Sequence, residues 1–160
     1  MKAASIKLIK DELKYRSQEE LLEICLQLAR FKKENKELLS YILYDSENEV
    51  VFINDLKEEI TEDFKLINTN SYFYIKKSVR KILRNIKKHI RYSKKKETEI
   101  ELLIHFCTLL KTMEPPMEKN VSLYNIFKKQ LENIQKAISK LHEDLQYDYN
   151  EEINILKIKL

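Results

Sequence analysis

Glycine is absent from this chain of 160 residues, which also has no tryptophan and only two prolines and two cysteines. Without glycine the chain cannot build a P-loop, a G-x-G-x-x-G dinucleotide turn or a G-x-S-x-G nucleophile elbow, because each needs a backbone position that only glycine tolerates. The tight turns of β-hairpins require glycine in the same way. The composition therefore argues against an all-β fold and against the enzyme classes that depend on these motifs.

The scarcity of cysteine excludes a disulfide framework. Cys25 and Cys107 lie far apart in apolar runs, and neither has the spacing of a zinc motif. We expect two reduced thiols in the core. The amino-terminal residues lack the apolar region of a signal peptide, and no stretch approaches the roughly 18 apolar residues of a membrane span. A cytoplasmic protein with no membrane span is therefore expected.

Helix signals are abundant along the whole chain. Apolar residues recur at steps of three and four over residues 53–67 and over 123–145. An all-α fold is expected, as a single compact domain over residues 1–160 with six to seven antiparallel helices in a bundle or in stacked hairpins. Helix starts are expected at three capping boxes and at one further serine, namely Ser17 with Glu20, Ser46 with Glu49, Thr98 with Glu101, and Ser122.

Three segments carry a resemblance to a known family. They are RSQEELLEICLQLARFKKENKELLSYIL at residues 16–43, IRYSKKKETEIELLIHFC at 90–107 and KLHEDLQYDY at 140–149. Over most of its length the chain resembles a family of small all-helical bacterial proteins of unassigned function. The resemblance implies a bacterial, cytoplasmic, all-α protein, and it transfers no functional residue.

Charge is segregated along the chain, although the net charge is only +4. Residues 71–96 hold eleven Lys and Arg and no Asp or Glu, whereas the segments on either side are net negative. On an ideal helix of about 100° per residue, ten of these cations share an arc of about 140°, and the apolar residues occupy the opposite side. Residues 72–92 are therefore predicted to form an amphipathic helix with its apolar stripe in the core and its cations outside.

The cationic run over residues 76–95 is the candidate functional site. Three of the chain's five arginines lie in it, although lysine is the usual basic residue of this chain. Arginine binds phosphate and carboxylate through two parallel hydrogen bonds. We expect a non-catalytic binding or adaptor module for a polyanion, with nucleic acid narrowly ahead of an acidic protein. The predicted polyanion-binding residues are Lys77, Arg80, Lys81, Arg84, Lys87, Lys88, Arg91 and Lys95.

Other roles fit the same segments. The protein is alternatively a helical scaffold for protein–protein interaction, in which the basic helix pairs internally with the acidic helix expected over residues 47–67. Binding to an anionic membrane surface is disfavoured, because the helix lacks tryptophan and needs its apolar side for the core. The apolar stripe over 123–145 is expected to face the bundle interior, with a homo-oligomer contact as its alternative use.

No residue pattern indicates catalysis or a cofactor. His105 and Cys107 lack the spacing of Glu-x-x-His or His-Glu-x-x-His metal motifs, and His105 is expected to be a hydrogen-bonded core or boundary residue. The acidic residues around His142 match no calcium-binding loop. We therefore expect a protein that is not an enzyme and has no cofactor and no metal site.

Overall fold

The protein is built from α-helices joined by short turns. The computed structural model describes residues 2–157, and within that range it has eight α-helices and no β-strand. The predicted all-α class is confirmed, whereas the predicted number of helices was six to seven. The additional helix arises because the helix expected over residues 123–145 divides into two.

Contacts between residues divide the chain into two compact units, Met1–Tyr44 and Asp45–Leu160. Each unit is described by itself below. A single domain over residues 1–160 stays a prediction.

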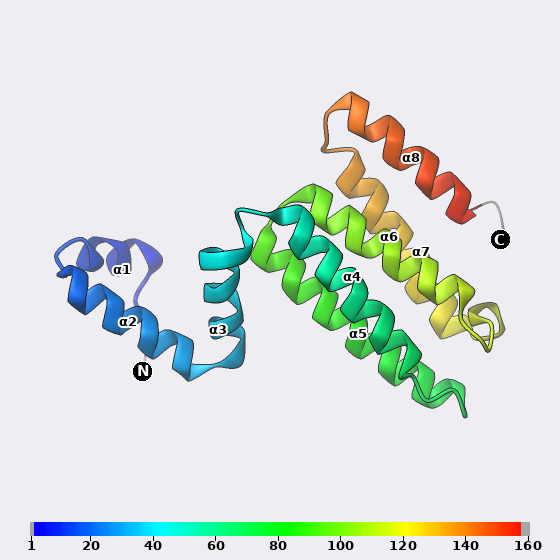
Figure 1. The fold of residues 1–160 in the computed structure, drawn as a ribbon, viewed down its shortest axis with the longest axis horizontal. Coiled ribbons are helices and arrows are strands. Elements are labelled where there is room, and N and C mark those ends of the chain that lie inside the picture. The colour runs from blue at the N-terminus through cyan, green and yellow to red at the C-terminus, as the bar shows by residue number, and fades with distance from the viewer. Residues whose placement is uncertain (1, 158–160) are drawn as a thin grey trace. The chain divides into compact units, whose positions relative to one another are not determined.

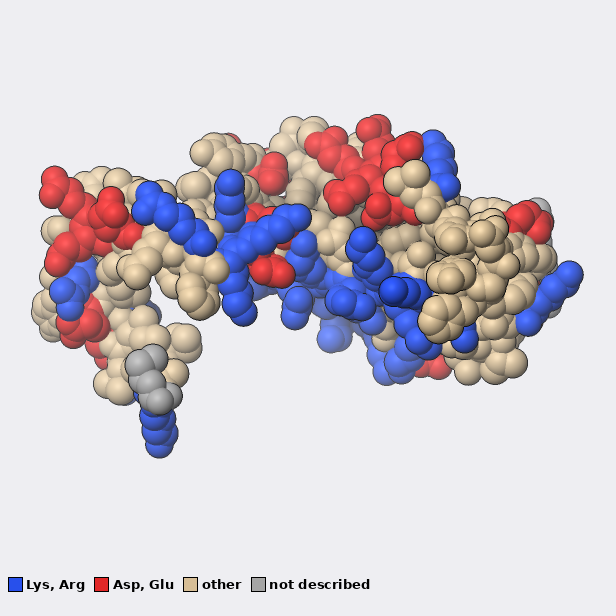
Figure 2. All heavy atoms as spheres, turned by 90° about the horizontal axis from the view of Figure 1, so that it is seen from below, with Lys and Arg blue, Asp and Glu red and all other residues tan. Residues whose placement is uncertain are grey.

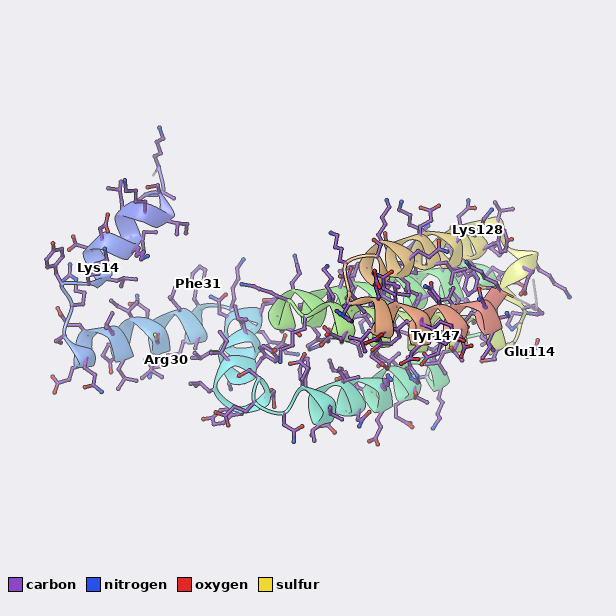
Figure 3. All side chains as sticks on the ribbon, turned by 90° about the horizontal axis from the view of Figure 1, so that it is seen from above. Lys14, Arg30, Phe31, Glu114, Lys128 and Tyr147 are labelled. Atoms are coloured by element: carbon purple, nitrogen blue, oxygen red, sulfur yellow. The ribbon has the colours of Figure 1, made fainter. Side chains whose placement is uncertain are left out.

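The smaller unit contains three amphipathic helices, α1 (Ile6–Leu13), α2 (Gln18–Phe31) and α3 (Lys33–Ser40), and a π-helical turn follows them at Tyr41–Asp45. The capping box predicted at Ser17 is confirmed, with both of its reciprocal hydrogen bonds present. None of the residues of the three helices is buried. Phe31, at the end of α2, is an example, because 76% of its surface is exposed (Figure 3).

The larger unit contains five long helices arranged around one of them. They are α4 (Glu49–Lys65), α5 (Tyr72–Ser93), α6 (Lys96–Thr112), α7 (Val121–Ile138) and α8 (Glu143–Lys157). Helix α6 contacts each of the other four (Figure 1). It is accordingly apolar around most of its circumference, as expected of a helix enclosed by its neighbours. Its fully or almost fully buried side chains include Ile100, Leu102, Leu103, Phe106, Cys107 and Leu110.

The apolar stripe over residues 123–145 does not lie on one helix. Helix α7 ends at Ile138, and the Leu141 amide donates to the Ile138 carbonyl at 2.9 Å in the turn that follows. The side-chain amide of Gln146 then donates to the Leu141 carbonyl at 2.8 Å, which satisfies a backbone acceptor at the start of α8. The stripe residues on α7 are buried within the unit, as the expectation of an interior face requires; they are Leu123, Phe127, Leu131, Ile134 and Ile138.

A buried polar cluster joins the ends of α4, α5 and α6. The hydroxyl groups of Ser93 and Thr98 each donate to Oε1 of Glu49 at 2.5 Å. Thr98 is fully buried and Ser93 is 8% exposed. Lys95 Nζ lies 2.8 Å from the other carboxylate oxygen of Glu49, so this carboxylate holds the corner between α5 and α6 against the start of α4.

Three of the predicted helix starts were wrong. Asn48, rather than Ser46, caps α4 by accepting a hydrogen bond from the Val51 amide at 3.4 Å. Asn120, rather than Ser122, caps α7 by accepting from the Leu123 amide at 3.2 Å. Helix α6 begins at Lys96, so Thr98 is inside the helix, where its hydroxyl serves the buried cluster instead of a cap.

Candidate functional site

The predicted basic amphipathic helix is present as α5. Its apolar stripe is buried against the rest of the larger unit, with Ile75 and Val79 fully inaccessible and Ile82, Leu83 and Ile86 less than 10% exposed. We call the seven predicted polyanion-binding residues that lie on α5 the cationic face. All of them are exposed except Lys88, which is half-buried; they are Lys77, Arg80, Lys81, Arg84, Lys87, Lys88 and Arg91.

The arginines of the cationic face are not neutralised by acidic side chains of the described chain. Within residues 2–157, Arg80, Arg84 and Arg91 make no ion pair. Arg80 donates one hydrogen bond, to the hydroxyl of Ser122 on α7, at 3.0 Å. The guanidinium groups are therefore available to an anion from outside.

Lys95 does not lie on the cationic face. Helix α5 ends at Ser93, and Lys94 has the left-handed backbone conformation, with φ of 59°. This conformation is disfavoured by about 1 kcal/mol for a residue with a Cβ atom, and the chain has no glycine to adopt it. Lys95 is the residue immediately before α6, and it forms an ion pair with Glu49. The expectation that residues 94 and 95 continue the outer face of the basic helix was wrong, because the buried cluster fixes the turn there.

The acidic residues of α4 gather in a patch of their own. Figure 2 shows a band of lysine and arginine across the larger unit and a patch of aspartate and glutamate beside it. Contacts between α4 and α5 are present at Glu59, which accepts a hydrogen bond from the Asn85 side-chain amide at 3.4 Å, and at Glu49, which accepts from the Ser93 hydroxyl at 2.5 Å. Glu62 pairs within its own helix, with Lys65 at 2.6 Å.

A groove runs beside the cationic face, between α5, α6 and α7. It has a volume of about 570 Å³. One wall carries Arg80, Arg84, Lys87 and Arg91, so all three arginines of α5 line it. The remaining lining is mostly aliphatic, with two polar side chains from the neighbouring helices; it consists of Leu83, Ile90, Leu103 and Ile126, with Glu99 and Asn133.

The sequence did not indicate this groove. The period of α5 gives the direction of its cations but not the identity of the helix beside them. Ile126 and Asn133 lie seven residues apart on α7, a spacing that places them on one face, and this is the signal that was available. Pairing that face with α5 requires the tertiary arrangement.

The two cysteines differ in exposure. Cys107 is fully buried in α6, and burial raises the pKa of its thiol to about 12. Its thiol is therefore protonated and unreactive at neutral pH. Cys25 is exposed on α2, which corrects the expectation that both thiols lie in the core. It lines a shallow pocket between α2 and α3, together with Leu28 and Leu38.

A polar cluster of α4, α6 and α8 was not predicted. Lys57 Nζ lies 2.5 Å from Glu101, and the Tyr149 hydroxyl donates to the other oxygen of Glu101 at 2.9 Å. Burial, followed by this hydrogen bond and the negative charge of Glu101, raises the pKa of Tyr149 above its ordinary value of 10. The phenol therefore keeps its proton at neutral pH, and the cluster connects three helices as a fixed set of hydrogen bonds.

His105 is a boundary residue with hydrogen-bond partners, as the sequence predicted. Its Nε2 lies 3.0 Å from the Lys57 carbonyl oxygen and 2.8 Å from the Thr61 hydroxyl. Burial, with a smaller contribution from the Lys57 charge, lowers the pKa of His105 from its ordinary 6.5, while the hydrogen bond to the Lys57 carbonyl acts in the opposite direction. Within residues 2–157, no three His, Cys, Asp or Glu side chains are gathered as metal ligands.

This environment predicts a pH dependence of stability. The unfolded chain binds a proton at His105 more readily than the folded chain, so stability is fully present above pH 6.5 and falls as the pH is lowered through the folded pKa. His105→Gln should reduce this part of the pH dependence, measured as the urea midpoint between pH 7.5 and pH 5. An unchanged profile for His105→Gln contradicts the prediction.

Comparisons with protein families, with curated proteins and with solved structures find no match to this chain. The resemblance to small all-helical bacterial proteins therefore stays a prediction. No helix within residues 2–157 has the length and apolar character needed to cross a membrane.

Proposed function

We propose that the protein is a non-catalytic binding module whose cationic face on α5 binds a polyanion. The proposal rests on one observation: Arg80, Arg84 and Arg91 share one side of α5 and make no ion pair within residues 2–157. Like charges at this spacing destabilise a helix by a few tenths of a kcal/mol per pair. A bound anion would remove that repulsion.

Nucleic acid is the polyanion that the surface fits best. The cations from Lys77 to Arg91 extend over about 21 Å of helix, a length that meets several phosphates along one backbone. Exposed aromatic rings lie at the start of the same helix, where Phe73 is 67% and Tyr74 is 47% exposed. Such rings stack on bases. Tyr72 is engaged elsewhere, because its hydroxyl donates to the Pro116 carbonyl at 2.8 Å.

The second candidate function is a protein–protein scaffold in which the basic segment pairs internally. The Lys95–Glu49 ion pair and the Asn85–Glu59 hydrogen bond favour it, since both join that segment to α4. Neither contact involves Arg80, Arg84 or Arg91, so we place polyanion binding first. An acidic protein remains the alternative ligand of the cationic face.

The proposal includes the setting of the module. We place it in the cytoplasm, which the two free thiols support, because reduced cysteines are typical of that compartment. Consecutive helices of the larger unit are proposed to run antiparallel, which the short connections from α4 to α5 and from α5 to α6 favour. Self-association through residues 123–145 would have to use exposed positions there such as Leu145, because the stripe of α7 is buried.

A double charge reversal tests the proposed function. Arg80→Glu with Arg84→Glu should abolish retention on heparin and raise the Kd for a labelled oligonucleotide at least about 100-fold, because two charge-assisted contacts to phosphate are lost. Fluorescence anisotropy measures the Kd, and circular dichroism measures folding. Both side chains are exposed, so the variant should keep its helix content and its melting temperature.

A matched variant controls for net charge. Lys128→Glu with Lys140→Glu changes the total charge equally at exposed positions outside α5, and Lys128 lies on α7 (Figure 3). It should weaken binding only a few-fold. If both double variants bind alike, the proposal is wrong. If the wild type ignores heparin and the arginine variant unfolds, internal pairing is the function of the basic helix.

A further inference from the structure

The groove between α5, α6 and α7 combines two properties that a surface for phosphates alone does not need. Arg80, Arg84 and Arg91 line one wall, and they are the only arginines of α5. The neighbouring helices contribute two aliphatic residues, Leu103 of α6 and Ile126 of α7, beside the polar Glu99 and Asn133. A volume of about 570 Å³ is within the range that small organic groups occupy in proteins.

We propose that this groove binds unstacked bases of a single-stranded nucleic acid, while the arginines of its wall bind the adjoining phosphates. The inference rests on the proposed function and names its ligand. A single strand alternates anionic phosphates with flat, weakly polar bases, which is the alternation of charge and apolar surface found across the groove. Proteins that hold single strands combine cations along the backbone with aromatic side chains on which bases stack, and in this groove Ile90 and Ile126 would take the place of the aromatic rings.

A duplex fits the same surface less well. Its bases are stacked and paired inside the helix, so its outer surface presents phosphates to the arginines and leaves the aliphatic lining in contact with water. Nothing would then be gained from Ile90 and Ile126, the two half-buried aliphatic residues of the lining. A single strand covers these side chains and removes their apolar surface from water.

The position of Glu99 supports bases rather than a second row of phosphates. Its carboxylate lines the groove and pairs with Lys96 at 2.6 Å, and it would repel a phosphate placed beside it. A carboxylate accepts hydrogen bonds from the N–H groups of bases, including the ring N–H of thymine, and an amide such as that of Asn133 pairs with base edges. Asn133 already donates to Gln130 at 3.1 Å, which holds its side chain on this face of α7.

The proposal extends to the ends of the groove. Lys77 continues the cationic face beyond Arg80, and the exposed rings of Phe73 and Tyr74 come before it on the same helix. A strand whose bases enter the groove would therefore have cations and stacking surfaces available for its next nucleotides. This extension distinguishes the site from one that accepts a short acidic peptide, which would need only the groove itself.

A comparison of strands with and without bases tests the inference, using the full-length protein. Three probes of equal length are compared by fluorescence anisotropy: a single-stranded oligothymidine, the same strand with abasic sites in place of its central nucleotides, and a duplex. The oligothymidine should bind at least about fivefold more tightly than the abasic strand, because only a base can cover the exposed aliphatic surface of Ile90 and Ile126. It should also bind more tightly than the duplex at equal salt.

Substitutions in the lining connect that difference to the groove. Ile90→Ala with Ile126→Ala shortens two half-buried lining residues, so the fold should be retained. The double variant should bind oligothymidine about as weakly as wild type binds the abasic strand, with unchanged retention on heparin. Ile155→Ala, at a residue 70% exposed on α8, is the matched control and should have no effect on any probe.

The outcomes separate this inference from the proposed function. Equal affinity for the oligothymidine and the abasic strand would overturn base binding in the groove and leave polyanion binding intact. No affinity for any of the three probes would overturn the proposed function itself. Displacement of heparin by a glutamate-rich amphipathic helical peptide, without any preference among the nucleic acids, would assign the groove to an acidic protein and overturn the inference.

Discussion

Raising the salt concentration from 50 to 200 mM should weaken binding of a single-stranded oligonucleotide about 300-fold. Six exposed cations of α5 make no ion pair within residues 2–157, namely Lys77, Arg80, Lys81, Arg84, Lys87 and Arg91. If each contacts one phosphate, counterion release gives a slope of about −4 in a plot of log K against log salt, because each contact to a single strand contributes about −0.7. Titrations at four salt concentrations measure that slope.

The double arginine variant tests whether the salt dependence comes from the cationic face. Arg80→Glu with Arg84→Glu removes two of the six contacts, so its slope should be shallower by about 1.4. A wild-type slope near zero would mean that the cationic face does not bind phosphates. A steep slope that the variant shares would place the phosphates on other cations.

Glu49→Ala should lower the free energy of unfolding by about 3 kcal/mol. The substitution removes the carboxylate that accepts from the buried hydroxyls of Ser93 and Thr98, which keep only the 3.1 Å hydrogen bond to each other, and each unsatisfied buried group costs about 1–3 kcal/mol. The ion pair with Lys95 contributes less, because that side chain is 46% exposed. Urea unfolding followed by circular dichroism measures the change.

Glu47→Ala is the control for Glu49→Ala. Glu47 is exposed and lies two residues earlier, so its replacement should change stability by no more than about 0.5 kcal/mol. Equal effects of the two substitutions would mean that the cluster does not hold the helix ends together. The cluster also fixes the end of α5, so Glu49→Ala should weaken oligonucleotide binding modestly in addition.

The basic helix was predictable because a single period determines it. Apolar residues of α5 recur at helical spacing with cations on the other side, and burial follows that pattern from Ile75 to Ile86. The capping box at Ser17 was predictable for a similar reason, since both of its hydrogen bonds are local. Local signals of this kind do not depend on which helices become neighbours.

The predictions that failed depend on tertiary structure. Thr98 has the sequence of a cap, but its hydroxyl is committed to Glu49, which is 49 residues away. The break between α7 and α8 has no glycine or proline to mark it, and the Gln146 side chain completes it. The same applies to the groove, whose lining comes from three helices.

Positive and negative charges are separated in this molecule, although its net charge is only +4. The cations of α5 and the acidic patch of α4 lie side by side rather than intermixed (Figure 2). This separation of charge gives the larger unit a permanent dipole moment. A long-range field of this kind turns a protein toward an oppositely charged polymer before the two touch, and such steering accelerates encounter roughly 10- to 1,000-fold. Capture of a strand would thus begin at a distance, with α5 already facing it.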